Sequence, residues 1–211
     1  MTKIVPIHDQ HFILHPTGSV FWQEQSMLLI SDVHLGKVMH FRKYGAAIPS
    51  HSVFKNFEQL DKAFDFFSAE TIVFLGDLFH SKKNNEWDLF AEWVSKTDAK
   101  IILVIGNHDV IDPKDYQDLQ ITVCSELVIG TFFLTHHPEE REGLFNFSGH
   151  IHPGIELRGA GKQSLRLPCF FQKPNQMILP AFGQFTGKYY LVPEEHDCVY
   201  AITKEEVVLI C

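Results

Sequence analysis

Short apolar runs that stop abruptly at polar residues recur along this chain. Runs of this kind, rich in β-branched and aromatic residues, are typical of buried β-strands. Five of them span residues 27–30, 71–75, 101–105, 131–134 and 144–147. Open α/β sheets place their ligands beyond the carboxyl ends of the strands. We therefore expect the polar residues that follow these five runs to meet at one site.

Two helices are predicted between the strands. Residues Pro49–Ser50 can start the first helix, with Ser50 as its cap. Apolar residues then recur at spacings of three or four, which predicts one buried stripe made of Phe54, Phe57, Leu60, Phe64 and Phe67. The second helix is predicted over Glu86–Lys96, and the side chains expected to face inward are Trp87, Phe90 and Trp93 or Val94.

Further strand patterns lie near the two ends of the chain. Residues 12–14 and 19–22 flank Pro16-Thr17-Gly18, which predicts a β-hairpin. Later strands are predicted over 176–179, 188–192, 198–202 and 207–210, with antiparallel pairing in a second sheet. We expect an α/β fold in one domain, residues 1–211. Its architecture would be a four-layer α/β/β/α sandwich of two mixed β-sheets flanked by helices.

Composition narrows the class of protein. The chain is 45% hydrophobic and 21% charged, which is typical of a globular protein. No apolar stretch approaches the ~20 residues of a membrane-spanning helix, so no membrane contact is expected. The first ten residues do not have the layout of a signal peptide, which favours a cytoplasmic location. The four cysteines are scattered, which favours ordinary thiols over a zinc finger or a disulfide framework.

Charge limits the kind of nucleic-acid binding that the chain can support. The formal net charge of -8 argues against a protein that coats nucleic acid without specificity. Local contact stays open, because bound divalent ions would make a cleft much more positive. The 13 histidines are many for this length, and histidine is the commonest metal ligand.

The polar residues that follow the five apolar runs are of metal-ligating types. The candidate ligands are Asp32, His34, Asp77, Asn107, His136, His150 and His152. Carboxylate, amide oxygen and imidazole together suit manganese, iron or zinc. In an extended segment, Asp32 and His34 would point the same way, as would the two histidines of the last pair. Asp77 is the natural bridging ligand, because a carboxylate can bind two cations and Gly76 leaves room beside it.

Each of these short motifs, taken singly, is as consistent with a loop, a turn or a surface strand. Their occurrence in this order, each just after an apolar run, favours one common site. The ordered set D-x-H, G-D, G-N-H-D, H and G-H-x-H, from Asp32 to His152, resembles the calcineurin-like metallophosphoesterase superfamily. This resemblance implies a two-sheet sandwich flanked by helices and a dinuclear metal centre.

The resemblance also implies a role for each site residue. One metal would be held by Asp32, His34, Asp77 and His152, and the other by Asp77, Asn107, His136 and His150. Catalytic roles would fall to Asn107, to His108, which would face the substrate, and to Asp109, which would orient His108. We expect two divalent ions, manganese first, with iron or zinc as alternatives. The chain departs from the family pattern at His80, where many members have an acidic residue, and this makes a protein Ser/Thr phosphatase less favoured.

A second resemblance concerns the substrate. Residues 31–45, followed by Ile48–Pro49, and residues 161–170 resemble the PdeM type of ligase-associated DNA damage response endonuclease, relatives of the repair nuclease SbcD. It implies DNA phosphodiesters as substrates and DNA repair proteins as partners. Candidate phosphate-backbone contacts are then Lys37, Arg42 and Arg166, together with Lys43, Arg158 and Lys162. Ordinary solvated surface charge is the alternative.

The sequence therefore predicts a dinuclear-metal phosphoesterase that hydrolyses phosphodiester bonds, as an endonuclease or phosphodiesterase in DNA repair. His108 is the candidate general acid for the leaving oxygen. One alternative is a small-molecule phosphoesterase acting on a nucleotide or a lipid-linked phosphate. A non-catalytic binding protein on the same fold is another. A transition-metal store is the third, although it would not need His108 and Asp109. The sequence does not predict the oligomeric state.

Overall fold

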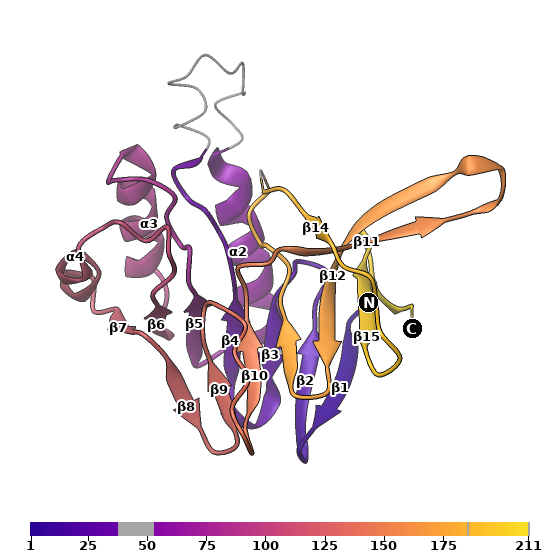
Figure 1. Cartoon of the computed structure of the whole chain (residues 1–211). Coiled ribbons are helices and arrows are strands. Elements are labelled where there is room, and N and C mark those ends of the chain that lie inside the picture. The colour runs from indigo at the N-terminus through magenta and orange to yellow at the C-terminus, as the bar shows by residue number, and fades with distance from the viewer. Residues whose placement is uncertain (38–52, 185, 211) are drawn as a thin grey trace.

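Two β-sheets packed face to face form the body of the molecule (Figure 1). The structure is a computed structural model, and it describes residues 1–37, 53–184 and 186–210. In this part of the chain the first sheet has seven strands, in spatial order β1 (Lys3–Ile7), β2 (Gln10–Leu14), β3 (Val20–Trp22), β4 (Met27–Ile30), β5 (Thr71–Leu75), β6 (Lys100–Val104) and β7 (Thr122–Cys124). Strands β4 to β7 run parallel, and β1 to β4 pair antiparallel.

The second sheet is mixed. Its strands in the described residues are β8 (Leu127–Ile129), β9 (Phe132–Leu134), β10 (Phe145–Ser148), β11 (Pro153–Arg158), β12 (Ser164–Lys173), β13 (Gln176–Ile178), β14 (Tyr189–Tyr190), β15 (Cys198–Ile202) and β16 (Val207–Leu209). The predicted antiparallel pairing is confirmed among β12, β15 and β16. It is wrong for β13 against β10 and for β14 against β11, which are parallel. The chain reverses between β11 and β12 and again between β12 and β13. Strand β13 therefore pairs with β10 in the parallel direction.

Strands that are buried on both faces explain the continuous apolar runs. In β5, Ile72 and Phe74 face a core beneath the helices, whereas Val73 and Leu75 face the core between the two sheets. Successive side chains point to opposite faces of a strand, so both faces must be apolar here. The core between the sheets is rich in aromatic residues, among them Phe12, Trp22, Phe132, Phe147 and Phe170.

Helices α2 (Phe54–Phe67), α3 (Asn85–Ser95) and α4 (Pro113–Asp118) lie along the outer face of the first sheet (Figure 1). The predicted second helix is confirmed, and its Trp87, Phe90 and Trp93 are buried. The outer face of the second sheet carries a smaller apolar cluster that includes Cys169, Phe171 and Val199. The predicted α/β fold of two mixed β-sheets with helices is thus confirmed. The fourth layer of the predicted α/β/β/α order is not seen in the described residues, where the α-helices flank the first sheet and none covers the second.

The stripe predicted for the first helix is wrong at one position. Phe54 is 47% exposed, whereas Phe57 and Leu60 are buried. At 3.6 residues per turn, Phe54 lies about 120° around the helix from Leu60, outside the buried face. Asn56 points inward instead, and its amide donates to the Val33 carbonyl over 3.4 Å. The predicted start of this helix at Pro49–Ser50 lies outside the described residues.

The hairpin of β11 and β12 projects from the body of the sandwich (Figure 1). Its register pairs Arg158 with Ser164 across the tip, and the short 3-10 turn Ala160–Lys162 closes it. Sequence analysis missed this arm, because it predicted no strand between residues 147 and 176. In the described ranges, no helix has the length and apolar character needed to cross a membrane.

Candidate metal centre

The candidate ligands lie where five strands end. Strands β4, β5 and β6 are parallel neighbours in the first sheet, and β9 and β10 are parallel neighbours in the second. Each of these strands is followed by a candidate ligand. In chain order, the first ligands after β4, β5, β6, β9 and β10 are Asp32, Asp77, Asn107, His136 and His150. Ligand atoms of Asp32, Asp77 and His136 lie within 4.8 Å of one another, and the ring of His136 contacts both Asn107 and His150. The predicted convergence of the five strand ends is therefore present in the structure.

One group of ligand atoms comes from Asp32, His34 and His152, whose nitrogen and oxygen atoms lie within 4.8 Å of one another. Nε2 of His152 is 3.0 Å from Oδ1 of Asp32 and 3.4 Å from Nε2 of His34. Asp32 and His34 are buried, whereas the side chain of His152 is 21% exposed. This group can therefore hold a cation that solvent and a substrate reach from the His152 side.

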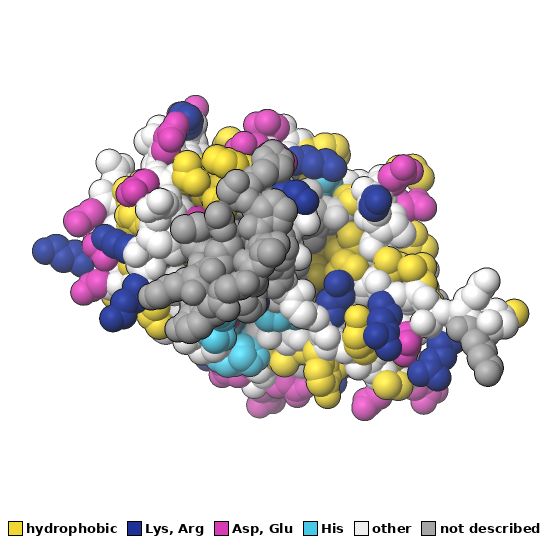
Figure 2. Space-filling view, turned by 90° about the horizontal axis from the view of Figure 1, so that it is seen from above, with side chains coloured by type: hydrophobic (Ala, Val, Ile, Leu, Met, Phe, Trp, Pro, Cys, Tyr) yellow, Lys and Arg dark blue, Asp and Glu magenta, His cyan; other side chains and the backbone are white. Residues whose placement is uncertain are grey.

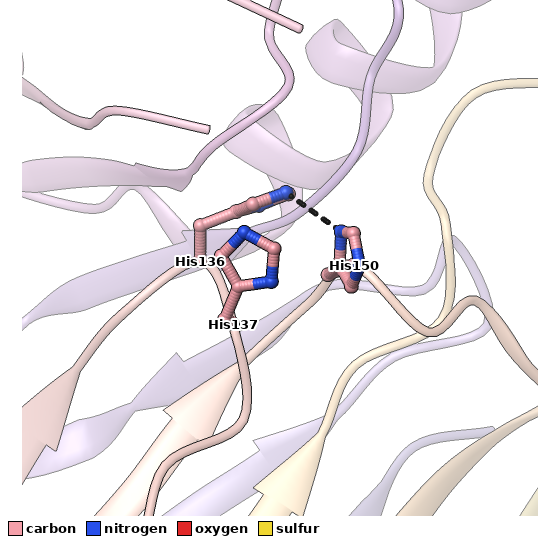
Figure 3. A group of neighbouring side chains, drawn as sticks. All are labelled: His136, His137 and His150. Atoms are coloured by element: carbon pink, nitrogen blue, oxygen red, sulfur yellow. Dashed lines mark hydrogen bonds between the residues drawn. The ribbon is translucent and has the colours of Figure 1, made fainter. Parts of the chain in front are cut away.

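A second group surrounds His136. Its Nε2 lies 3.0 Å from Oδ1 of Asn107, 3.4 Å from Oδ1 of Asp77 and 3.2 Å from Nδ1 of His150. Figure 3 shows the rings of His136 and His150 turned toward each other from the ends of β9 and β10. The exposed His137 joins them, with its ring centroid 4.0 Å from that of His150.

Asp77 lies between the two groups. One ligand atom from each of Asp32, Asp77 and His136 fits within 4.8 Å, and all three residues are buried. Oδ1 of Asp77 also accepts the backbone N–H of His108 over 2.8 Å. This is the position that a bridging carboxylate needs, since it can face both cations of a metal pair at once.

The protonation of these side chains suits metal ions. Burial lowers the pKa of His34 to about 3, so its imidazole is neutral and has a lone pair to offer. Burial raises the pKa of Asp32, but hydrogen bonding and charge from His152 hold it below its usual value. Nδ1 of His136 lies 2.9 Å from the Leu75 carbonyl, so it carries the proton and leaves Nε2 free. Lone pairs from nitrogen and oxygen thus face one another, and a cation would satisfy them.

The backbone around the ligands is not extended, contrary to the prediction for the D-x-H and H-x-H motifs. Asp32 and His34 have φ of 54° and 52°, and His150 and His152 have φ of 66° and 53°. Asp77 is also in this left-handed region, with φ of 52°. Residues other than glycine seldom adopt this left-handed backbone conformation, and strained residues cluster at functional sites. The tight turn still brings Asp32 and His34 together, since Nε2 of His34 lies 3.9 Å from Oδ1 of Asp32.

Two glycines make room for the ligands. Gly76 has φ of 79°, and a Cβ there would collide with the ring of His136 and approach Cα of Gly106 to 2.8 Å. A Cβ on Gly106 would collide with Asp77. Larger residues at these two positions would push the strand ends apart. This agrees with the expectation that Gly76, by lacking a side chain, leaves space beside Asp77.

His108 and Asp109 differ in their surroundings. His108 is exposed, and its ring centroid is 5.9 Å from that of His34 and 4.5 Å from that of His80. Asp109 was expected to orient His108, but its carboxylate is turned to the backbone and accepts the N–H groups of Asp77, Phe79 and Gly106. Burial raises the pKa of Asp109 to about 6 against these hydrogen bonds. The hydrogen bonds of Asp109 thus hold the loop after β5 against the loop after β6.

The basic residues expected to contact phosphate have different surroundings. Lys37 is half-buried near the site. Burial lowers the pKa of its ammonium group, and the negative charges of nearby Asp32 and Asp77 oppose this only in part. Arg166 lies on the hairpin, paired with Glu156 over 3.2 Å and stacked 5.2 Å from the ring centre of Tyr190. Arg158 also pairs with Glu156. Arg42 and Lys43 lie outside the described residues.

Sequence analysis assigned no ligand role to His137, which the geometry adds to the second group. The doublet His136-His137 was visible in the sequence, but one ligand at that place was enough for the motif. His80, where many family members have an acidic residue, lies beside the rings of both His34 and His108.

Comparison with known proteins identifies the family. The family model "Calcineurin-like phosphoesterase" matches residues 26–157. The chain belongs to the calcineurin-like phosphoesterase family. Members of this family hydrolyse phosphoesters with metal ions, and the aspartate and histidine groups described above can bind such ions. This chain is accordingly a metal-dependent phosphoesterase.

Solved structures similar to this calcineurin-like phosphoesterase include the crystal structure of Pseudomonas putida nuclease MPE. The two chains are 26% identical, each is covered over 100% of its length, and the TM-score is 0.83. A second structure, the protein of unknown function AQ665 from Aquifex aeolicus, is 18% identical over 60% of this chain and 78% of its own, with a TM-score of 0.44. No curated protein matches the chain.

Proposed function

We propose that this phosphoesterase hydrolyses phosphodiester bonds of nucleic acid at a centre of two divalent metal ions. The observation that carries the proposal is the arrangement of two groups of ligand atoms around the carboxylate of Asp77. Two metals in such sites sit ~3.5–4 Å apart and suit in-line displacement at phosphorus. The mixture of carboxylate, amide and imidazole favours manganese, with iron or zinc as alternatives.

Each ligand has a proposed place in this centre. One ion would be held by Asp32, His34, Asp77 and His152, and the other by Asp77, Asn107, His136 and His150. When bound, the ions would activate a water molecule and neutralise charge on the phosphoryl oxygens. Asn107 and Lys37 would contact those oxygens as well, because the amide of Asn107 is exposed and Lys37 lies near both buried carboxylates.

His108 is the proposed general acid. Its ring is exposed beside the ligand cluster, where a substrate phosphate has access to it. Proton donation to the leaving oxygen in the transition state lowers the barrier most when that oxygen is a poor leaving group. Asp109 would act on this step indirectly, by holding the loop of His108 against the loop of Asp77.

Nucleic acid is the proposed substrate for two reasons. The solved structure that is similar over the whole chain is described as a nuclease. The face that carries the site also shows exposed histidines, with lysine and arginine side chains around it (Figure 2). An acidic chain that carries lysine and arginine side chains on the face of its site fits local contact with a phosphate backbone. A role in DNA repair follows from the resemblance to repair endonucleases and is part of this proposal.

Side-by-side assays test the proposal. Metal-loaded protein is given single- and double-stranded DNA, cyclic nucleotides, phosphomonoesters and a small aryl phosphodiester at equal concentrations. We expect DNA to be the best substrate by kcat/KM. If small phosphate esters are turned over well while neither form of DNA is cleaved, the nuclease proposal fails and a small-molecule phosphoesterase replaces it.

A further inference from the structure

A groove leads away from the metal centre. Its first hollow, of about 320 Å³, is lined by His152, Leu167, Pro168, Ala181, Lys188 and Lys204. A second hollow of about 420 Å³ continues from there past Lys55 and Lys62. The two hollows share Pro16, Thr17, Gln59, Gln184 and Lys204, so they form one continuous groove. We call it the lysine groove.

The lysine groove is both apolar and cationic. The wall of the first hollow is partly apolar. It includes the partly exposed residues Pro16, Leu167, Pro168 and Ala181. Figure 2 shows a hydrophobic hollow on this face with lysine and arginine side chains along its border. Apolar surface of this kind can pack against the face of a nucleobase, and ammonium groups beside it match a phosphate backbone.

The groove lysines are available for a ligand. Lys55, Lys62, Lys188 and Lys204 form no ion pair with a carboxylate among the described residues. The arginines of the described residues, in contrast, already form ion pairs. Arg141, Arg158 and Arg166 each pair with a glutamate. Glu58 is the acidic residue that lines the groove, at its far end. In a chain of net charge -8, four lysines beside a single glutamate along one groove favour an anionic, elongated ligand.

We infer that the lysine groove binds the nucleotides on one side of the cleaved phosphodiester, with a base against the hollow beside His152 and the next phosphates on Lys188 and Lys204. The inference rests on the proposed function and names the substrate-binding surface for it. Continuity with the metal centre through His152 places this segment next to the reacting phosphate. The second hollow extends the contact beyond a single nucleotide.

Neutralising the groove tests the inference. The double variant Lys188→Ala/Lys204→Ala is compared with Lys96→Ala/Lys114→Ala, which removes the same charge from exposed positions outside the groove. We expect kcat/KM on an eight-nucleotide strand to fall on the order of tenfold in the groove variant only. The small aryl phosphodiester and the bound metal count should be unchanged, because they need no groove. The salt dependence of binding should become shallower by about 1.4 in log K against log salt, roughly 0.7 for each phosphate.

The substrate provides a second test that cannot disturb folding. Abasic sites are moved one position at a time along the strand on both sides of the cleaved bond. We expect wild-type protein to lose efficiency at one or two adjacent positions on one side, where the base packs in the hollow. Equal losses on both sides, equal behaviour of the two lysine pairs, or an equal fall on the small diester would overturn the inference. If wild-type protein cleaves the small diester but no nucleic acid, the proposed function itself fails, which is a different result.

Discussion

The backbone N–H of His108 donates a 2.8 Å hydrogen bond to Oδ1 of Asp77. The residue proposed to protonate the leaving group is therefore held by the carboxylate proposed to bridge the two metals. Because the same oxygen also lies 3.4 Å from Nε2 of His136, the charge on Asp77 affects both the second metal position and the placement of His108. Changes at Asp77 should therefore affect metal binding first, and changes at His108 should affect proton transfer alone.

Asp77→Asn is expected to remove metal. An amide oxygen can still accept the N–H of His108, but it loses the negative charge that two cations share. We expect metal content to fall from about two ions per chain to one or fewer. Metal analysis after gel filtration measures this, with exposed Asp118→Asn as the matched control. Full metal content in Asp77→Asn would show that this carboxylate is not the bridge.

His108→Ala is expected to keep its metal and lose turnover. General acids contribute ~10²–10⁴-fold, so kcat on a diester with a poor leaving group should fall by this order. A substrate whose leaving group departs easily should be affected much less, since it needs little protonation. Steady-state kinetics on such a pair of aryl diesters makes the comparison. Equal losses on both substrates would assign His108 to binding instead.

Asp109→Ala is expected to destabilise the fold. Its carboxylate accepts three backbone N–H groups, from Asp77, Phe79 and Gly106. Each buried group left without a partner costs roughly 1–3 kcal/mol. Urea unfolding in the presence of EDTA separates this loss from metal binding, and His108→Ala is the control that leaves the three bonds in place. A variant as stable as the wild type would mean that water replaces the carboxylate at no cost.

The buried His15 should make the fold sensitive to acid. Burial, with smaller effects of Lys62 and the N-terminus, lowers its pKa from 6.5 to about 4, and its ring bonds to Thr17. Between these two pH values the unfolded chain binds the proton and the folded chain does not. The free energy of unfolding therefore falls as pH is lowered through this window, by at most about 1.4 kcal/mol per pH unit.

Urea unfolding at pH 7 and pH 5 measures this sensitivity. His15→Asn should lose part of the pH dependence, while His196→Asn, at an exposed position, should keep it. If wild type and His15→Asn lose stability equally on acidification, the acid sensitivity arises from other groups.

Much of the site was predictable because its ligands follow strand ends. The runs at 27–30 and 71–75 coincide with β4 and β5, and the polar residues after them meet as expected. The role of Asp109 was not predictable, because its hydrogen bonds join residues 30 and 32 positions apart, which only the folded sheet brings together. The left-handed φ values of Asp32 and His34 were missed for a similar reason. Sequence periodicity reports which side chains share a face, not how a tight turn places them.

The lysine groove was also invisible in the sequence. Lys55 and Lys62 lie on α2, Lys188 just before β14 and Lys204 just after β15, so no run of basic residues marks them. Folding brings these separate elements to one surface. The basic residues that were noticed, such as Arg166, stand next to motifs in the sequence but are paired with glutamate in the structure.

A metal titration tests the central claim most directly. Apoprotein at a concentration well above the metal dissociation constants receives Mn²⁺ in small steps, and cleavage of a DNA oligonucleotide is measured at each step. The account predicts no activity in EDTA and a rise that ends at about two equivalents per chain. Full activity without metal, or a plateau at one equivalent, would contradict it.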